Sequence, residues 1–179
     1  MVFNEQTQEI LDTFKAFMDD TEAPYMYVTG GADTGKTINL NHIIQYCINE
    51  DISHCICTFT HKAIGVLRSK MPKKAMLATL HSFLIKRPTI NTNTTKVKHV
   101  NSNTRVGSSD IVRVIFIDEF SIVGNRNYED IQSLQWDDTG KLLTKVVFLG
   151  DLNQLPPVGG IQSITPSGDY CVHLTKVHR

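Results

Sequence analysis

The segment VTGGADTGKTINL, residues 28–40, constrains the fold more than any other part of the chain. Its first glycine, Gly30, is followed after four residues by Gly35, Lys36 and Thr37, between a short apolar run and a helix-like run. Glycines let a backbone wrap closely around an anion, and the amide groups at a helix N-terminus favour negative charge. A strand, a glycine-rich loop and a helix in this order predict an α/β domain that holds the phosphates of a nucleotide.

The loop itself supplies the predicted cofactor contacts. We expect Lys36 to reach the β- and γ-phosphates of ATP, and the Thr37 hydroxyl to bind Mg²⁺. Asp33 brings a negative charge to a place where many such loops have glycine, so we expect a lower nucleotide affinity than a glycine loop would give. The expected nucleotide contacts are Gly30, Gly31, Ala32, Asp33, Thr34, Gly35, Lys36 and Thr37.

Length and composition set the class of protein. The chain of 179 residues is long enough for one domain with a hydrophobic core. Basic and acidic residues both number 18, so any surface for nucleic acid must be local. No apolar run approaches the roughly 18 residues that span a bilayer, and the N-terminus lacks a signal-peptide pattern. Four cysteines without a Cys-x-x-Cys pair favour buried reduced thiols over a metal site, and an intracellular, cytoplasmic protein without membrane contact.

Hydrophobic periodicity predicts alternating helices and strands. Helices are expected over 4–18, 36–48 and 61–71, and strands over 25–30, 54–60, 112–118 and 145–151. Asn4 is the expected cap of the first helix. The strands lack polar alternation, which predicts a parallel sheet covered on both faces. The expected core residues of the first two helices are Ile10, Leu11, Phe14, Phe17 and Met18, then Ile38, Ile43, Ile44 and Cys47.

Two further apolar strands end in groups suited to hydrolysis. In VIFIDEFS, residues 114–121, we expect Asp118 to hold Mg²⁺ and Glu119 to orient and deprotonate a water molecule. In VVFLGDLNQLPPVG, residues 146–159, the neutral amide of Gln154 suits contact with a γ-phosphate or the attacking water. The alternative for each segment is a polar strand end that faces solvent.

One segment differs in composition from the rest. Residues 86–109 are rich in Thr, Asn and Ser, and contain five basic residues and no acidic one. A linker or disordered loop is one interpretation. The other is a small hairpin insertion, taken to span 86–111, that contacts a phosphate backbone. The alternation in TKVKHV gives this second interpretation weak support.

Together these segments resemble the first motor domain of a superfamily 1 DNA helicase of the RecD-like kind, as found in phages and viruses. The matching segments are GGADTGKT, TFTHKA (58–63), TLHSF (79–83), IDEFS (117–121), GDLNQLPPV (150–158) and LTKVHR (174–179). The resemblance implies a RecA-like fold and contacts to single-stranded DNA; without it, the two histidines among these contacts would be ordinary surface residues. The implied contacts are Thr60, His61, Lys62, Thr79, His81 and Ser82, with Lys96 and Lys98 in a strand-separating insertion.

The resemblance also implies two further nucleotide contacts. Arg179 matches an arginine that contacts the γ-phosphate, which suits a fixed cation for developing charge. An adenine-reading glutamine is expected near the N-terminus. We favour Gln6, with Gln8 as the alternative, although the usual spacing falls on Thr7.

The function implied is that of an ATP-dependent DNA helicase motor. Residues 1–179 form a single RecA-like domain that binds Mg-ATP and single-stranded DNA, with RNA not excluded. ATP hydrolysis would drive translocation and unwinding once a second RecA-like domain is present, with replication, recombination or repair proteins as possible partners. Alone, the chain is expected not to unwind a duplex. The alternatives are a non-catalytic nucleic-acid-binding fragment, with Asp33 blocking the pocket, and another phosphate-loop ATPase, such as one that remodels proteins.

Overall fold

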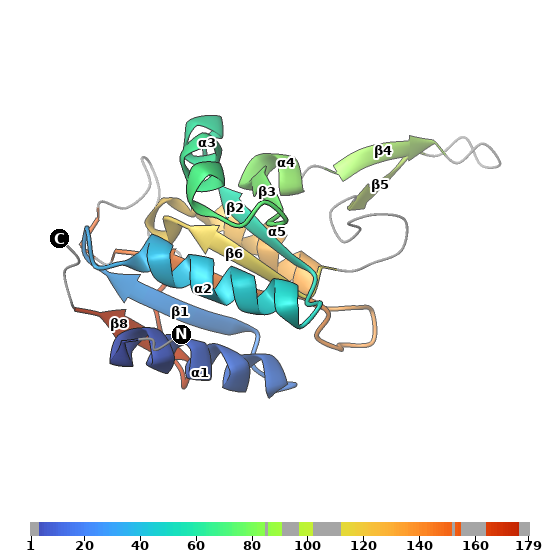
Figure 1. Cartoon of the computed structure of the whole chain (residues 1–179). Helices are drawn as coiled ribbons and strands as arrows, with labels where there is room; N and C mark the ends of the chain where they lie inside the picture. The colour runs from blue at the N-terminus through green and yellow to red at the C-terminus, as the bar shows by residue number, and fades with distance from the viewer. Residues whose placement is uncertain are drawn as a thin grey trace.

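A six-stranded, all-parallel sheet forms the centre of the molecule, in the order β3-β2-β6-β7-β1-β8 (Figure 1). The computed structural model describes residues 4–84, 86–90, 97–101, 112–151, 153–154 and 164–175. The strands are β1 (Tyr25–Gly30), β2 (His54–Thr58), β3 (Leu77–Thr79), β6 (Val114–Asp118), β7 (Lys145–Gly150) and β8 (Cys171–Leu174). The expected parallel sheet is confirmed.

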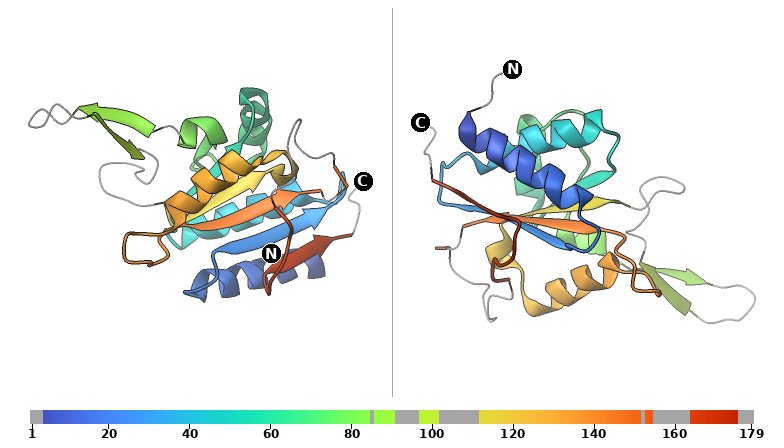
Figure 2. Two further views of the ribbon diagram at one scale, coloured as in Figure 1. Left: turned by 180° about the vertical axis from the view of Figure 1, so that it is seen from behind. Right: turned by 90° about the horizontal axis from the view of Figure 1, so that it is seen from below.

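Helices cover both faces of this sheet (Figure 2). On one face, α1, α2 and α3 pack over a core that includes Phe14, Ile43 and Phe116, and on the other α4 and α5 pack over Ile115 and Phe148. Within β6, alternate side chains enter the two cores, which explains why the strands lack polar alternation. The helices are α1 (Glu5–Asp19), α2 (Lys36–Asn49), α3 (His61–Lys70), α4 (Leu80–Leu84) and α5 (Asn125–Gln135), with a 3₁₀ turn, η2, at Phe120–Ile122.

The predicted ends of α1, α2 and α3 agree with the structure to within one residue, but one residue predicted to lie in the core is exposed. The Asn4 side chain accepts a hydrogen bond from the Thr7 amide at 2.7 Å, so the predicted cap of α1 is confirmed. The prediction for Ile38 is wrong, because its side chain is 51% exposed. Leu40 is buried in its place and shares one face of α2 with Ile43, three residues further on. The strand expected over 54–60 ends at Thr58, since Thr60 caps α3.

A two-stranded antiparallel hairpin projects from the sheet domain. It pairs β4 (Lys86–Ile90) with β5 (Val97–Asn101), so the interpretation as a hairpin-like insertion holds. Residues 91–96 and 102–111 lie outside the described part of the chain. Lys96 is among them, and the side chain of Lys98 is likewise not described.

The thiols are all free, but they are not all buried. Cys47, Cys55 and Cys57 are buried as expected, with 4.0 Å between the Sγ atoms of Cys55 and Cys57 on one face of β2. Cys171 is exposed, which corrects the expectation of four buried thiols. It lies on the edge strand β8, where alternate residues face outward. Among the described residues, no helix has the length and apolar character needed to cross a membrane.

Candidate functional site

The phosphate loop joins β1 to α2 at the carboxyl ends of the parallel strands (Figure 1). A Cβ atom on Gly30 would lie 2.6 Å from Thr34 Oγ1 and 2.9 Å from the Leu174 carbonyl oxygen, so only glycine fits there. Gly35 has a φ of 84°, in the left-handed region that glycine adopts without strain. The two motif glycines are therefore required for different reasons, one by packing and one by backbone conformation.

The loop is built to receive an anion. Gly35 is the N-cap of α2 and offers no side-chain acceptor to the amides of the first turn, which leaves them directed outward. Lys36 Nζ donates to the carbonyl oxygens of Gly30 and Gly31, both at 2.7 Å, and so lies folded over the loop. A cavity of about 200 Å³ is lined by residues 33–38 and by Lys70 from the end of α3. These features fit the phosphates of a nucleotide.

Asp33 occupies a strained position at the rim of this cavity. Its side chain is exposed, and its backbone has a φ of 60°, which a residue other than glycine adopts at a cost. The predicted effect of its charge on nucleotide affinity stays a prediction.

The acid pair stands at the end of β6, close to the loop. Burial raises the pKa of Asp118 to about 6, with a smaller contribution from the Glu119 charge, while a hydrogen bond from the Glu119 amide and the Lys36 ammonium oppose this rise. Glu119 has φ 62° and ψ 52°, a left-handed conformation for a residue with a side chain. Such strain is typical of functional positions that the surrounding fold holds in place.

The segment that follows β7 contacts the segment that follows β6. The Gln154 side-chain oxygen accepts a hydrogen bond from Ser121 Oγ at 3.2 Å, two residues beyond Glu119. Asp151 holds the connecting turn by accepting the Asn153 amide at 2.9 Å. A Cβ atom on Gly150 would lie 2.7 Å from the Phe120 ring, so glycine there allows the two segments to pack. No feature of the sequence pointed to Ser121 as a partner of Gln154.

The residues expected to hold Mg²⁺ offer the oxygen ligands that this ion prefers. Thr37 supplies a hydroxyl at the start of α2, and Asp118 a carboxylate near enough to Lys36 for the lysine charge to influence its pKa. The donor set therefore fits a magnesium ion that is shared with a nucleotide.

The expected nucleic-acid contacts that follow β2 and β3 lie at the same end of the sheet as the phosphate loop. β2 and β3 are parallel neighbours, with Thr58 opposite Thr79, so the segments that follow them start side by side. Thr60 caps α3 by accepting the Ala63 amide at 3.1 Å, and His61 is exposed in its first turn. His81 is likewise exposed at the start of α4.

The other three expected contacts differ in exposure. Lys62 and Ser82 are exposed, whereas Thr79 is buried. The Thr79 hydroxyl accepts the Ser82 amide at 3.1 Å and donates to Ser82 Oγ at 2.8 Å. Thr79 therefore positions α4 in this structure, and its contact with DNA stays a prediction.

Of the two nucleotide contacts implied at the chain ends, Gln6 lies within the described residues and Arg179 does not. The Gln6 side chain is buried at the start of α1, and its Oε1 atom has no hydrogen-bond partner within the described residues. Gln8 instead donates to both Asp12 carboxylate oxygens at 2.9 Å, which occupies the alternative candidate. α1 begins near the end of the sheet where β1 ends (Figure 1). Arg179 lies outside the described residues.

This fold and site define a phosphate-loop nucleotide-binding domain of the RecA-like kind. The family model described as "AAA domain" matches residues 13–160. The chain belongs to this family.

Comparison with solved structures supports the same fold. The Pif1 helicase from Candida albicans has 20% identity and a TM-score of 0.64, over 99% of this chain and 41% of that one. Bacteroides Pif1 bound to ssDNA has 21% identity and a TM-score of 0.60, over 99% of this chain and 43% of that one. An uncharacterized protein of Acanthamoeba polyphaga mimivirus is 25% identical over 97% of this chain and 38% of its own length. The chain thus spans less than half of each of these proteins.

Proposed function

We propose that the chain is the first RecA-like motor domain of an ATP-dependent DNA helicase. One observation supports this above all: the carboxyl ends of a single parallel sheet hold both the phosphate loop with its acid pair and the exposed residues His61 and His81. A nucleotide and a nucleic-acid strand bound at this end would contact segments that follow neighbouring strands. The likeness to Pif1 helicases in fold agrees with this proposal.

In this proposal each residue near the phosphate loop has a separate role in ATP binding or hydrolysis. Lys36 and the amides at the start of α2 bind the phosphates, and Gln6 reads the adenine. Thr37 and Asp118 hold Mg²⁺, which neutralises charge on the phosphates when it is bound. Glu119 accepts the proton of the attacking water. Gln154, through its bond to Ser121, connects the γ-phosphate to the segment behind the acid pair.

The nucleic-acid side of the site uses the segments after β2 and β3. Thr60, His61, Lys62, His81 and Ser82 contact single-stranded DNA beside the nucleotide. We propose that a second RecA-like domain completes the motor, which agrees with the share of the Pif1 chains that this chain spans. We also propose an intracellular location, because free thiols are typical of reducing compartments.

Glu119→Gln separates binding from hydrolysis. The variant should bind ATP as the wild type does and lose DNA-stimulated turnover in a protein that contains both motor domains, because the amide cannot accept the proton of water. Phosphate release and nucleotide affinity are measured with single-stranded DNA and with RNA of the same sequence. Equal turnover in the variant would refute the assigned base. Stimulation by RNA alone would replace DNA as the substrate, and stimulation by neither would favour a different phosphate-loop ATPase.

A further inference from the structure

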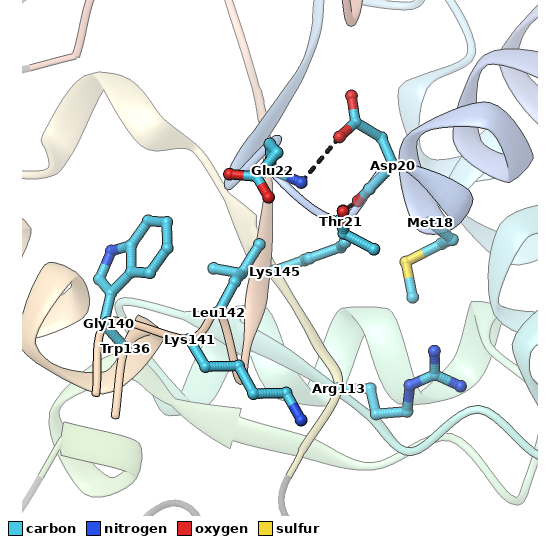
Figure 3. Close-up of a pocket in the computed structure, with 10 residues that line it drawn as sticks. All are labelled: Met18, Asp20, Thr21, Glu22, Arg113, Trp136, Gly140, Lys141, Leu142 and Lys145. Atoms are coloured by element: carbon cyan, nitrogen blue, oxygen red, sulfur yellow. Dashed lines mark hydrogen bonds between the residues drawn. The ribbon is translucent and has the colours of Figure 1, made fainter. Parts of the chain in front are cut away.

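A second cavity lies at the opposite end of the sheet from the nucleotide site. It has a volume of about 280 Å³ and is lined by residues that precede β1, β6 and β7, among them Glu22, Arg113 and Lys141 (Figure 3). β1 is six residues long, which puts the amino ends of the strands about 20 Å from the phosphate loop. The proposed function assigns no role to the residues that line this cavity.

Trp136 forms one wall and is the only tryptophan of the chain. Its side chain is 41% exposed, an unusual state for so large an apolar group. The turn that presents it is well fixed, because Trp136 and Leu142 form an antiparallel bridge. Asp137 Oδ1 also accepts hydrogen bonds from the Thr139 amide at 2.8 Å and the Lys141 amide at 2.9 Å. The indole is therefore exposed on a rigid support.

Two cations line the same cavity as this indole. Arg113 and Lys141 are both exposed, and neither forms an ion pair with any carboxylate in the described ranges of the chain. Their side chains enter the cavity region from different segments (Figure 3). The backbone amide of Lys145 donates to the Arg113 carbonyl at 2.9 Å, which ties Arg113 to the start of β7.

Two other charged side chains of the cavity, Lys145 and Asp20, already form hydrogen bonds within the protein. Lys145 Nζ donates to the carbonyl oxygens of Phe17, Asp20 and Ala23, and is buried. The Asp20 carboxylate accepts the Glu22 amide at 2.8 Å and the Tyr170 hydroxyl at 2.9 Å. Glu22 remains as an exposed acceptor at the rim. An exposed aromatic ring, two cations and one acceptor are thus available to a ligand.

We propose that this cavity is a second binding site for single-stranded nucleic acid. One base stacks on the Trp136 indole, the flanking phosphates pair with Arg113 and Lys141, and the Glu22 carboxylate accepts a base amino group. Stacking on aromatic side chains beside basic residues is how proteins hold unpaired strands without reading their sequence. The inference rests on nucleic acid being the partner of the proposed function, and adds a site at the other end of the sheet.

The place of this cavity suits a strand separated from its complement. The β4–β5 hairpin and the turn that carries Trp136 both project from the end of the molecule where the parallel strands begin (Figures 1 and 2). A strand passing along this end would not contact His61 or His81, which follow the carboxyl ends of β2 and β3. Two strands could therefore be held at opposite ends of one domain.

The lone tryptophan makes the test direct. Titration of the 179-residue chain with a single-stranded oligonucleotide should quench the indole fluorescence. When the excitation wavelength is too long for the five tyrosines to absorb, all of the emission comes from Trp136. In parallel, anisotropy of a labelled oligonucleotide gives the affinity. Trp136→Ala should weaken binding by about tenfold, and Trp136→Phe by much less, because phenylalanine retains a ring for stacking.

Charge variants test the phosphate contacts separately. Lys141→Gln and Arg113→Gln should each reduce the salt dependence of binding by about one counterion in the log–log slope. Arg126→Gln is the matched control, since this exposed arginine lies at the other end of α5, and it should leave the slope unchanged.

The outcomes separate this inference from the proposed function. Binding by anisotropy that leaves the indole unquenched, with Trp136→Ala unchanged in affinity, would overturn the second site while the proposed DNA binding stands. A loss of binding only in a His61→Ala, His81→Ala double variant would locate all contacts at the carboxyl ends and overturn it likewise. No binding of any oligonucleotide would overturn both.

Discussion

Two residues of the candidate site, Asp33 and Glu119, adopt a left-handed backbone that glycine would adopt more easily. Both lie at the end of the sheet where the phosphate loop and the acid pair meet. Conformational cost at positions of this kind persists only where the surrounding structure imposes it. At residue scale, the site therefore combines charge and backbone strain, and the two can be separated by substitution.

For Asp33, two variants distinguish charge from strain. Asp33→Asn removes the negative charge and keeps a side chain that tolerates the left-handed region, whereas Asp33→Gly removes both the charge and the strain. We expect both to lower the dissociation constant of Mg-ATP several-fold, because a charge near a triphosphate costs about 1 kcal/mol at an exposed position. Isothermal titration measures this. Unchanged or raised constants in both variants would contradict the assigned repulsion.

For Asp118, the raised pKa predicts a pH-dependent loss of stability. The folded carboxyl has a pKa of about 6, raised from 3.8, so the folded state holds this proton more tightly than the unfolded state. Stability must then fall as the pH rises through this window, and the deficit is complete above it. Two pKa units correspond to at most about 3 kcal/mol.

Asp118→Asn should remove this loss of stability, because the amide does not ionise. Without nucleotide or metal, the variant should melt at a higher temperature than the wild type near neutral pH, and at the same temperature near pH 4. Thermal unfolding followed by circular dichroism checks both conditions. Glu119→Gln is a useful comparison, because loss of the neighbouring charge should restore only part of the stability. A gain in melting temperature that is equal at both pH values would contradict the assigned cause.

At the scale of elements, the end of α1 is fastened to the start of β7 by one buried lysine. Lys145 Nζ donates to the carbonyl oxygens of Phe17, Asp20 and Ala23 and lies 4.4 Å from the centre of the Phe17 ring. Burial lowers the pKa of this lysine, which the nearby Asp20 charge opposes. Because α1 also carries Gln6, this lysine helps to orient the helix that is proposed to read adenine.

Lys145→Met should cost at least about 2 kcal/mol of unfolding free energy, because carbonyl groups inside the protein would lose their donor. Lys141→Met is the matched control on the preceding turn, where the side chain is exposed and the expected change is within about 0.5 kcal/mol. Chemical denaturation measures both. Equal effects of the two substitutions would show that the buried hydrogen bonds contribute little.

The four cysteines should differ in their reactivity, because one of them lies on the edge strand β8. Cys171 is exposed there, although partial burial and the Asp169 charge also raise its pKa. Burial raises the pKa of Cys47 to about 12, and the pKa of Cys57 is raised by its hydrogen bond with Cys55 and by burial. A thiol-reactive dye at mildly alkaline pH should therefore label one cysteine in the native chain and four after unfolding. Mass spectrometry identifies the labelled site. Rapid native labelling of a β2 cysteine would contradict the described burial.

At the scale of the whole molecule, most of what the sequence predicted correctly came from short motifs and from runs of apolar residues. The phosphate loop, the acid pair and four apolar strands were predictable, since this glycine spacing between continuous apolar runs is typical of phosphate-loop domains. β3 and β8 were missed because they have three and four residues, too few for a periodic pattern. Ile38 was misplaced because spacing alone does not show where a helix face turns toward solvent. Contacts between distant segments, such as Ser121 with Gln154, have no sequence signal at all.

Binding of Mg-ATP by the phosphate loop is the property on which the proposed function depends most directly. Calorimetric titration of the purified chain with Mg-ATP, beside the Lys36→Ala variant, measures whether the loop holds a triphosphate. The proposal predicts saturable binding by the wild type and an affinity about tenfold or more lower in the variant, since alanine has no ammonium group to reach the phosphates. Absence of binding by the wild type at millimolar ATP, or equal binding by the variant, would contradict it.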